Sequence, residues 1–120
     1  MKTVWFDRHP DLALSDDVDL EGLRPETVVV GAGLTGLAIG VLLARSGQDV
    51  VILEYQRLGA VTTGHTTAKL SLLQGSQFSK ILKRHSPEML AAYLEANREG
   101  QAWLRRFMDE RGVEYQVRDA

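Results

Sequence analysis

The clearest pattern in the chain is a change of hydrophobic period between residues 27 and 54. The run from Val28 to Val30 is continuously β-branched, which is typical of a parallel strand buried on both faces. The stretch Leu34–Ser46 suits a helix of about 20 Å at a rise of 1.5 Å per residue. A second apolar run, Val50–Leu53, predicts another buried strand. The pattern therefore predicts a parallel strand–helix–strand unit.

In the second half of the chain, the apolar residues first recur at helical spacing and then alternate with polar residues. Apolar positions within residues 78–85 recur at helical spacing, with basic residues turned elsewhere. Ser86 then reads as an N-cap and Pro87 as the first helical position, and a period of roughly 3.6 residues continues until Gly112. Residues 113–117 alternate between apolar and polar, which predicts a half-buried strand of the antiparallel type.

Residues 1–25 form an acidic lead-in. Its apolar cluster, Val4–Phe6, is expected to pack on a neighbouring element, and the rest is expected to form a partly ordered arm over the surface. Asp16, Asp17 and Asp19 resemble part of a calcium loop, but the glycine and the distal glutamate of such a loop are absent in register. We therefore expect no metal site here.

The turn between the first strand and its helix reads G-A-G-L-T-G, and its residue types suit a dinucleotide. Gly31 permits the tight turn, Gly33 lets the backbone approach a pyrophosphate, and Gly36 lets the helix pack closely. The helix N-terminus offers unpaired N–H groups and a positive dipole end to phosphates, and Gly47 suits the left-handed position that closes the helix. Glu54 ends the second strand, where a carboxylate can accept hydrogen bonds from ribose hydroxyls.

A loop rich in small and hydroxyl residues follows Glu54 and reads Y-Q-R-L-G-A-V-T-T-G-H-T-T-A-K-L. Arg57 is either a solvated surface arginine or a partner for an adenine or phosphate. Residues 62–67 are either a turn-rich surface loop or a segment with a large ligand against its backbone.

Composition limits the remaining classes of function. The chain has 120 residues, of which 44% are hydrophobic and 25% charged, as in an ordinary soluble globular protein. Its net charge of -2 gives no basic field for nucleic acid, and the absence of cysteine excludes thiolate metal sites and cysteine nucleophiles within it. We find no apolar stretch of signal-peptide or membrane-spanning length, and expect a cytoplasmic protein.

The stretch from Val28 to Glu54 resembles the extended fingerprint of flavoproteins, with a fourth small residue at Gly40 and Gly47 seven positions later. The T-T-G-H-T-T-A-K loop is similar to the second FAD-contacting segment of the D-amino-acid oxidase and glycine oxidase-like superfamily. The G-H-T-T-A-K sequence of this loop, together with the W-F-D lead-in, most resembles members that carry a C-terminal Rieske iron–sulfur domain.

The resemblance implies an α/β fold, with a Rossmann-like βαβ unit that binds FAD, followed by helices and the first strand of a substrate domain. The expected organisation is an arm over residues 1–25, the FAD-binding unit and flavin loop over 26–75, and a truncated helical segment over 76–120. The expected cofactor-binding residues are Gly31, Gly33, Leu34, Thr35, Gly36, Glu54, Tyr55, Arg57, Thr62, Thr63, Gly64, His65, Thr66 and Thr67. No catalytic residue is assigned.

The same resemblance implies a much longer protein, of which this chain would be the N-terminal part. Its small-molecule substrate would carry an amine or amino-acid-like C–N bond, and its partner beyond this chain would be an iron–sulfur domain or another electron acceptor. Two alternatives use the same strand–helix–strand unit. They are an NAD(P)-dependent dehydrogenase, which gives residues 62–67 no special role, and a non-catalytic nucleotide-binding fragment.

His65 has three interpretations. It forms a backbone or phosphate hydrogen bond, it contacts a noncovalent flavin, or it bonds covalently to the flavin. The last interpretation comes from the dimethylglycine and sarcosine dehydrogenase branch, in which a similar T-T-x-H segment carries a flavin-linked histidine. Gly64 stands where that branch has tryptophan, so the chain departs from that pattern next to His65.

Overall fold

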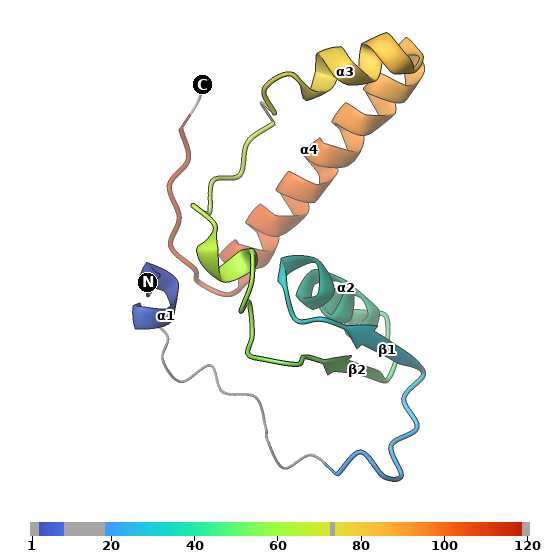
Figure 1. The fold of residues 1–120 in the computed structure, drawn as a ribbon, viewed down its shortest axis with the longest axis vertical. Helices are drawn as coiled ribbons and strands as arrows, with labels where there is room; N and C mark the ends of the chain where they lie inside the picture. The colour runs from blue at the N-terminus through green and yellow to red at the C-terminus, as the bar shows by residue number, and fades with distance from the viewer. Residues whose placement is uncertain (1–2, 9–18, 73, 119–120) are drawn as a thin grey trace. The chain divides into compact units, whose positions relative to one another are not determined.

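The computed structural model describes residues 3–8, 19–72 and 74–118, and the chain divides into two compact units, residues 1–67 and 68–120. The first unit contains α1 (Val4–Arg8), β1 (Thr27–Val30), α2 (Leu34–Arg45), β2 (Val50–Leu53) and a short 3₁₀ turn, η1 (Thr63–His65) (Figure 1). The second unit contains α3 (Gln77–Arg84) and α4 (Pro87–Glu110).

The strands of the first unit form a two-stranded parallel sheet. Thr27 pairs with Val50 and Val30 with Leu53, and α2 makes the connection between the strands and packs on one face of the sheet (Figure 1). This confirms the predicted strand–helix–strand unit. Arg45 ends the helix one residue earlier than predicted.

The prediction that the first strand is buried on both faces is wrong for the described residues. Burial alternates along β1, and Val30 at its end is 85% exposed. The prediction that the second strand is buried is also wrong, because three residues of β2 are half-buried and Leu53 is exposed. The cause is that α2 covers one face of the sheet, whereas no described element of this unit packs on the opposite face. The β-branched run therefore predicted the strand correctly but not its surroundings.

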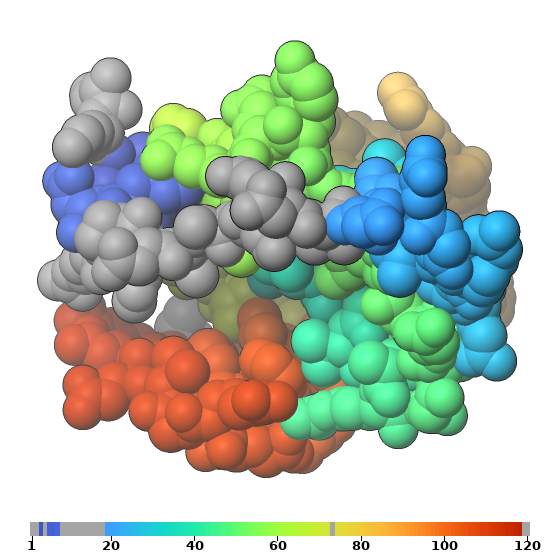
Figure 2. Space-filling model, turned by 90° about the horizontal axis from the view of Figure 1, so that it is seen from below, coloured from blue at the N-terminus to red at the C-terminus, as the bar shows by residue number. Residues whose placement is uncertain are grey.

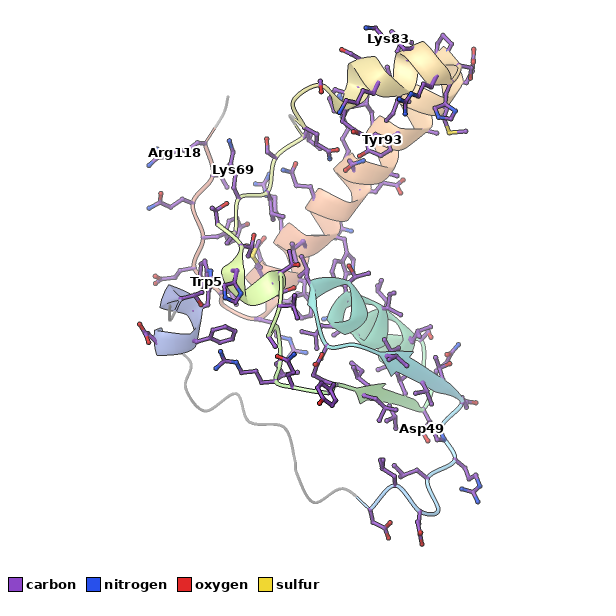
Figure 3. The ribbon with its side chains drawn as sticks, in the orientation of Figure 1. Trp5, Asp49, Lys69, Lys83, Tyr93 and Arg118 are labelled. Atoms are coloured by element: carbon purple, nitrogen blue, oxygen red, sulfur yellow. The ribbon has the colours of Figure 1, made fainter. Side chains whose placement is uncertain are left out.

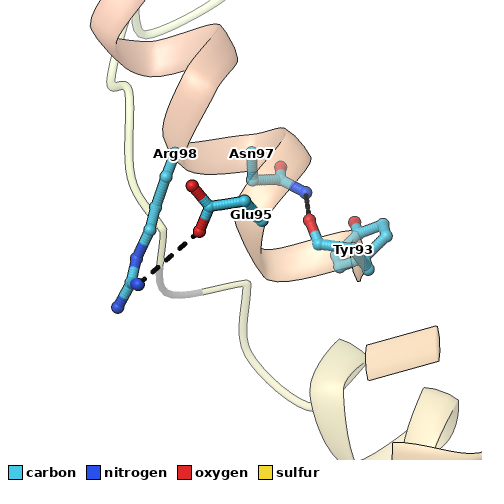
Figure 4. Close-up of polar contacts among 4 residues, drawn as sticks. All are labelled: Tyr93, Glu95, Asn97 and Arg98. Atoms are coloured by element: carbon cyan, nitrogen blue, oxygen red, sulfur yellow. Dashed lines mark hydrogen bonds and ion pairs between the residues drawn. The ribbon is translucent and has the colours of Figure 1, made fainter. Parts of the chain in front are cut away.

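In the second unit, the predicted helices are confirmed. The side chain of Ser86 accepts a hydrogen bond from the Met89 N–H at 3.3 Å, so Ser86 is the N-cap of α4 and Pro87 is its first residue. Within α4, the Asn97 side chain donates to the Tyr93 carbonyl at 2.7 Å (Figure 4). An exposed ion pair between Arg98 and Glu95, at 3.9 Å, lies on the same helix (Figure 4).

The strand predicted over residues 113–117 is not formed. Residues 113–118 have no regular structure and are exposed, and the Tyr115 hydroxyl donates back to Asp109 of α4 at 2.8 Å. A strand needs a neighbouring strand to satisfy its N–H and C=O groups. The described part of the second unit contains no other strand, so the alternating pattern has no partner there.

The lead-in packs as predicted on a neighbouring element, because α1 contacts η1. Of the acidic positions in the lead-in, Asp11, Asp16 and Asp17 lie outside the described residues.

Candidate functional site

The turn after β1 continues the sheet and then reverses sharply. The Gly31 N–H donates to the Leu53 carbonyl at 2.7 Å, which adds one hydrogen bond beyond the last strand pair. Gly31 has φ +100°, a conformation that L side chains rarely adopt, so the turn requires glycine at this position. Ala32, the next residue, is almost completely buried.

The first backbone N–H groups of α2 follow directly after this turn. Gly33 is the N-cap and has no side chain to act as a cap. A hydroxyl from a distant part of the chain takes this role instead, because the Leu34 N–H donates to Thr63 Oγ1 at 2.9 Å. The N–H groups of Thr35 and Gly36, in the same first turn, have no acceptor within the helix. They are donors available for an anion.

Two further glycines bring α2 close to the sheet. A Cβ on Gly36 would overlap the carbonyl oxygen of Gly31, and a Cβ on Gly40 would come within 2.5 Å of the Ile52 side chain. The helix therefore lies directly on the turn and on β2, as the resemblance to the flavoprotein fingerprint implies for Gly36.

Glu54 follows β2, and its half-buried carboxylate bonds to the chain's own backbone. Oε2 accepts from the Ala32 N–H at 2.8 Å, and Oε1 accepts from the Gln56 N–H at 2.9 Å. The hydrogen bonds from Gln56 and Ala32, with a smaller one from Tyr55, lower the pKa of Glu54 below its ordinary value of 4.5, although partial burial opposes them. Glu54 is therefore ionised at neutral pH. A carboxylate has about four acceptor positions, so lone pairs remain for a ligand.

The loop after Glu54 is bonded to the glycine turn. The Gly59 N–H donates to the Ala32 carbonyl at 3.0 Å, and the Gly64 N–H donates to the Gly59 carbonyl at 2.6 Å. With the bond from Leu34 to Thr63, these contacts make the turn, the helix N-terminus and η1 one connected piece.

The glycine turn, the start of α2 and the residues around η1 border an open hollow of about 470 Å³. It is lined by Val30, Gly31, Gly33, Leu34, Thr35, Gly36, Thr62, Thr63 and Thr66. The structure thus brings together most of the residues that the sequence singled out from the two segments. Val30 also lines the hollow, and sequence reasoning missed it because it was assigned to the interior of the sheet.

Six of the expected cofactor residues do not line this hollow: Glu54, Tyr55, Arg57, Gly64, His65 and Thr67. Tyr55 is 96% exposed, and Thr67 is exposed as well. The guanidinium of Arg57 lies over the ring of Phe6, with its central carbon 3.5 Å from the ring centroid. Gly64 is buried beneath the same ring.

His65 is exposed and bonds to its own loop. Its Nδ1 lies 2.6 Å from the Val61 carbonyl. Because a carbonyl can only accept, we assign a proton to Nδ1. Contact of His65 with a flavin, covalent or not, stays a prediction of the sequence.

Other kinds of site are not found in the described residues. Those residues contain no group of three or more histidine, cysteine, aspartate or glutamate side chains that could hold a metal ion. The described helices also include none that is long and apolar enough to cross a membrane.

A parallel strand–helix–strand unit whose glycine turn and helix N-terminus border one hollow, with a strand-end carboxylate bonded to the same turn, is typical of nucleotide-binding domains. More narrowly, the chain belongs to the FAD-dependent oxidoreductase family DAO, whose match covers residues 26–120. Members of this family bind FAD.

One curated relative is the putative Rieske 2Fe-2S iron–sulfur protein YhfW of Bacillus subtilis (strain 168). The two sequences are 24% identical over 102 residues, which cover 85% of this chain and 19% of the relative. The chain thus spans about a fifth of that relative's length. No solved structure matches the chain.

Proposed function

We propose that this chain is the N-terminal FAD-binding part of a flavin-dependent oxidoreductase that oxidises an amine or amino-acid-like C–N bond by hydride transfer to FAD. The observation that carries the proposal is the convergence of Glu54 and Thr63 on the glycine turn. Glu54 accepts the N–H of Ala32 at 2.8 Å, and Thr63 accepts the N–H of Leu34 at 2.9 Å. The end of β2 and the loop after it, which have separate expected roles at a dinucleotide, are thus both hydrogen-bonded to residues 32–34 at the start of α2.

The lining of the hollow suits the negative charge of a pyrophosphate. None of the residues that line it is acidic, and three of them are glycines that keep side chains away from the backbone. The N–H groups of Thr35 and Gly36 can donate to phosphate oxygens at the positive end of the α2 dipole. Thr63 uses its oxygen as an acceptor for Leu34, so its own hydroxyl proton is free to donate to a ligand.

The chain's own residues therefore bind and orient the cofactor. Glu54 is ionised and keeps lone pairs for the hydroxyls of the adenosine ribose. Thr62, Thr63 and Thr66, which line the hollow, would contact the pyrophosphate, and Arg57 with the remaining residues of 62–67 would contact other parts of the dinucleotide. FAD, when bound, supplies the acceptor for the two electrons of the oxidation. The β1–α2–β2 unit would form the start of a larger Rossmann-like sheet in the complete protein.

The substrate and the partner are inferred from relatives. The amine or amino-acid-like substrate follows from the resemblance to D-amino-acid and glycine oxidases. The Rieske name of the Bacillus relative supports an iron–sulfur domain or electron-acceptor partner beyond this chain. Its greater length supports a complete protein that is longer than 120 residues. We also propose that this protein is cytoplasmic, because the sequence has no apolar stretch of signal-peptide length.

The decisive experiment is Gly33→Val in the full-length protein. A Cβ on Gly33 lies at an acceptable 3.4 Å from Thr63 Oγ1, so the fold tolerates it, but the branched side chain of valine fills the space that a pyrophosphate needs. We expect the purified variant to carry at least about tenfold less flavin, judged by its visible absorbance. Gly100→Ala is the control, since nothing lies within 4 Å of that position.

Normal flavin content in Gly33→Val would refute the placement of the cofactor. Wild-type protein that bound NAD and showed no flavin absorbance would replace the proposal with a nicotinamide-dependent dehydrogenase.

A further inference from the structure

The helix α1 precedes the stretch that matches the FAD-dependent oxidoreductase family, yet it contacts the loop that borders the hollow. The family match begins at residue 26, whereas α1 covers Val4–Arg8 and packs on η1. In the space-filling view, the dark blue atoms of α1 lie against the green atoms of this loop (Figure 2). Trp5 and Phe6 of α1 both contact this loop.

Trp5 fixes the backbone at one end of η1. Its indole N–H donates to the carbonyl oxygen of Thr66 at 2.8 Å, and the ring lies beside η1 (Figure 3). The indole N–H is a donor with fixed direction, so the bond sets the orientation of the Thr66 peptide. Thr66 is also one of the residues that line the hollow.

Phe6 contacts three other residues of the same loop. Its ring covers the Cα of Gly64 so closely that a Cβ there would overlap it. The ring meets the His65 imidazole edge to face, with centroids 6.1 Å apart at 73°. The guanidinium of Arg57 stacks on it at 3.5 Å, a cation–π distance.

Hydrogen bonds connect the loop residues that α1 contacts to the glycine turn. Gly64, which lies under the Phe6 ring, is bonded through Gly59 to the Ala32 carbonyl. Its neighbour Thr63 caps the Leu34 N–H. Half of loop residues 57–66 are exposed, and the two buried ones, Gly59 and Gly64, have no side chain to contribute apolar contacts of their own. Its position therefore depends on α1 on one side and on the turn on the other.

We propose that α1 is a clamp that holds loop residues 57–66 against the glycine turn, with Trp5 and Phe6 as positioning residues for the bound dinucleotide. The nature of the ligand rests on the proposed function, but the clamp itself does not. Phe6 also determines where the positive charge of Arg57 stands, because the guanidinium lies over its ring. Loss of either side chain should leave the turn intact and loosen the loop.

The clamp is tested by amide hydrogen exchange on the full-length protein without FAD. Trp5→Phe removes the indole donor, and Phe6→Leu keeps an apolar side chain but removes the aromatic face. We expect the amides of Gly59 and Gly64 to exchange about threefold to tenfold faster in each variant, as loss of one hydrogen bond or cation–π contact implies. Phe6→Tyr retains the ring and should restore the wild-type rate.

Two internal controls separate a loosened loop from a damaged fold. The amides of α4 belong to the second unit and should exchange at the wild-type rate. Trp103→Phe replaces a tryptophan of α4 that stacks on Phe107, and it should leave the loop amides unchanged. Wild-type exchange at Gly59 and Gly64 in both α1 variants would overturn the clamp.

The positioning role is tested by titration of the same proteins with FAD. We expect the dissociation constant to rise about threefold to tenfold in Trp5→Phe and Phe6→Leu, and to return towards wild type in Phe6→Tyr. Faster loop exchange with an unchanged dissociation constant would overturn this role. Wild-type protein that failed to bind FAD would overturn the proposed function and the ligand assignment, while the exchange experiment would still decide the clamp.

Discussion

Both carboxylate oxygens of Glu54 accept hydrogen bonds from the chain's own backbone, which sets how stability depends on pH. These bonds lower the pKa of Glu54 in the folded state, first through Gln56 and then through Ala32, from its ordinary value of 4.5. A lowered folded pKa contributes stability that is fully present above the unfolded pKa. This contribution is lost as the pH falls through the folded pKa.

Glu54→Gln should therefore unfold more easily than wild type at neutral pH, because an amide offers one acceptor oxygen where the carboxylate offers two. We expect the difference in denaturant midpoint between the two proteins to narrow as the pH falls from about 5 to about 3. Denaturant titrations of both full-length proteins at several pH values measure it. A difference that stayed constant over this range would contradict the assignment.

The residue types in the sequence predicted part of this site, but they did not predict its backbone hydrogen bonds. The sequence predicted Gly31, Gly36 and Glu54 because turn, packing and strand-end positions restrict which residues can stand there. It did not predict that Ala32 would bond to both Glu54 and Gly59, since backbone partners carry no residue-type signal. The aromatic positions of the lead-in predicted packing on a neighbour, but not which neighbour.

At the scale of elements, the contribution of the N-cap residue Ser86 to the stability of α4 can be tested directly. Ser86 accepts from the Met89 N–H, and a hydrogen bond with the Ser86 side chain is the main cause that lowers the pKa of Glu88. Ser86→Ala should destabilise the second unit by about 0.5–2 kcal/mol, the usual cost of losing a cap. It should also raise the pKa of Glu88 towards 4.5.

Hydrogen exchange at α4 and an NMR titration of Glu88 measure the two effects. Ser79→Ala is the matched control, because Ser79 lies exposed within α3 rather than at a helix start. An equal effect of the two substitutions would show that Ser86 has no capping role.

Periodic elements were predicted almost to the residue, and the failures have a common physical cause. The two long helices and both strands follow from local spacing, caps and glycine stops, which act within a few residues. The strand predicted over residues 113–117 needs a partner from elsewhere, and the burial of β1 needs a second covering layer. Local patterns carry no information about whether such partners are present.

At the scale of the whole chain, burial predicts low independent stability. Among the described residues, Ala32 and Ile81 are the buried apolar ones, and each strand of the sheet pairs on one side alone. A polypeptide of residues 1–120 therefore gains little from burial to offset its conformational entropy. We expect it to show no cooperative thermal transition and no turnover.

Circular dichroism melts and flavin reduction by a candidate amine substrate measure these properties. A sharp transition together with substrate-dependent flavin reduction by the 120-residue polypeptide would contradict the expectation.

The residues of the candidate site lie close together in the sequence, so they are synthesised early in translation. The glycine turn, Glu54, η1 and α1 all fall within residues 1–67, and the parallel strands that carry the turn pair at a separation of 23 residues, from Thr27 to Val50. Closing so short a loop costs little entropy, and domains form from the N-terminus during translation. The residues of the candidate site are therefore all synthesised before α3 and α4, so contacts between them can begin to form on the ribosome, although residues 1–120 alone bury too little apolar surface to hold them as a stable fold.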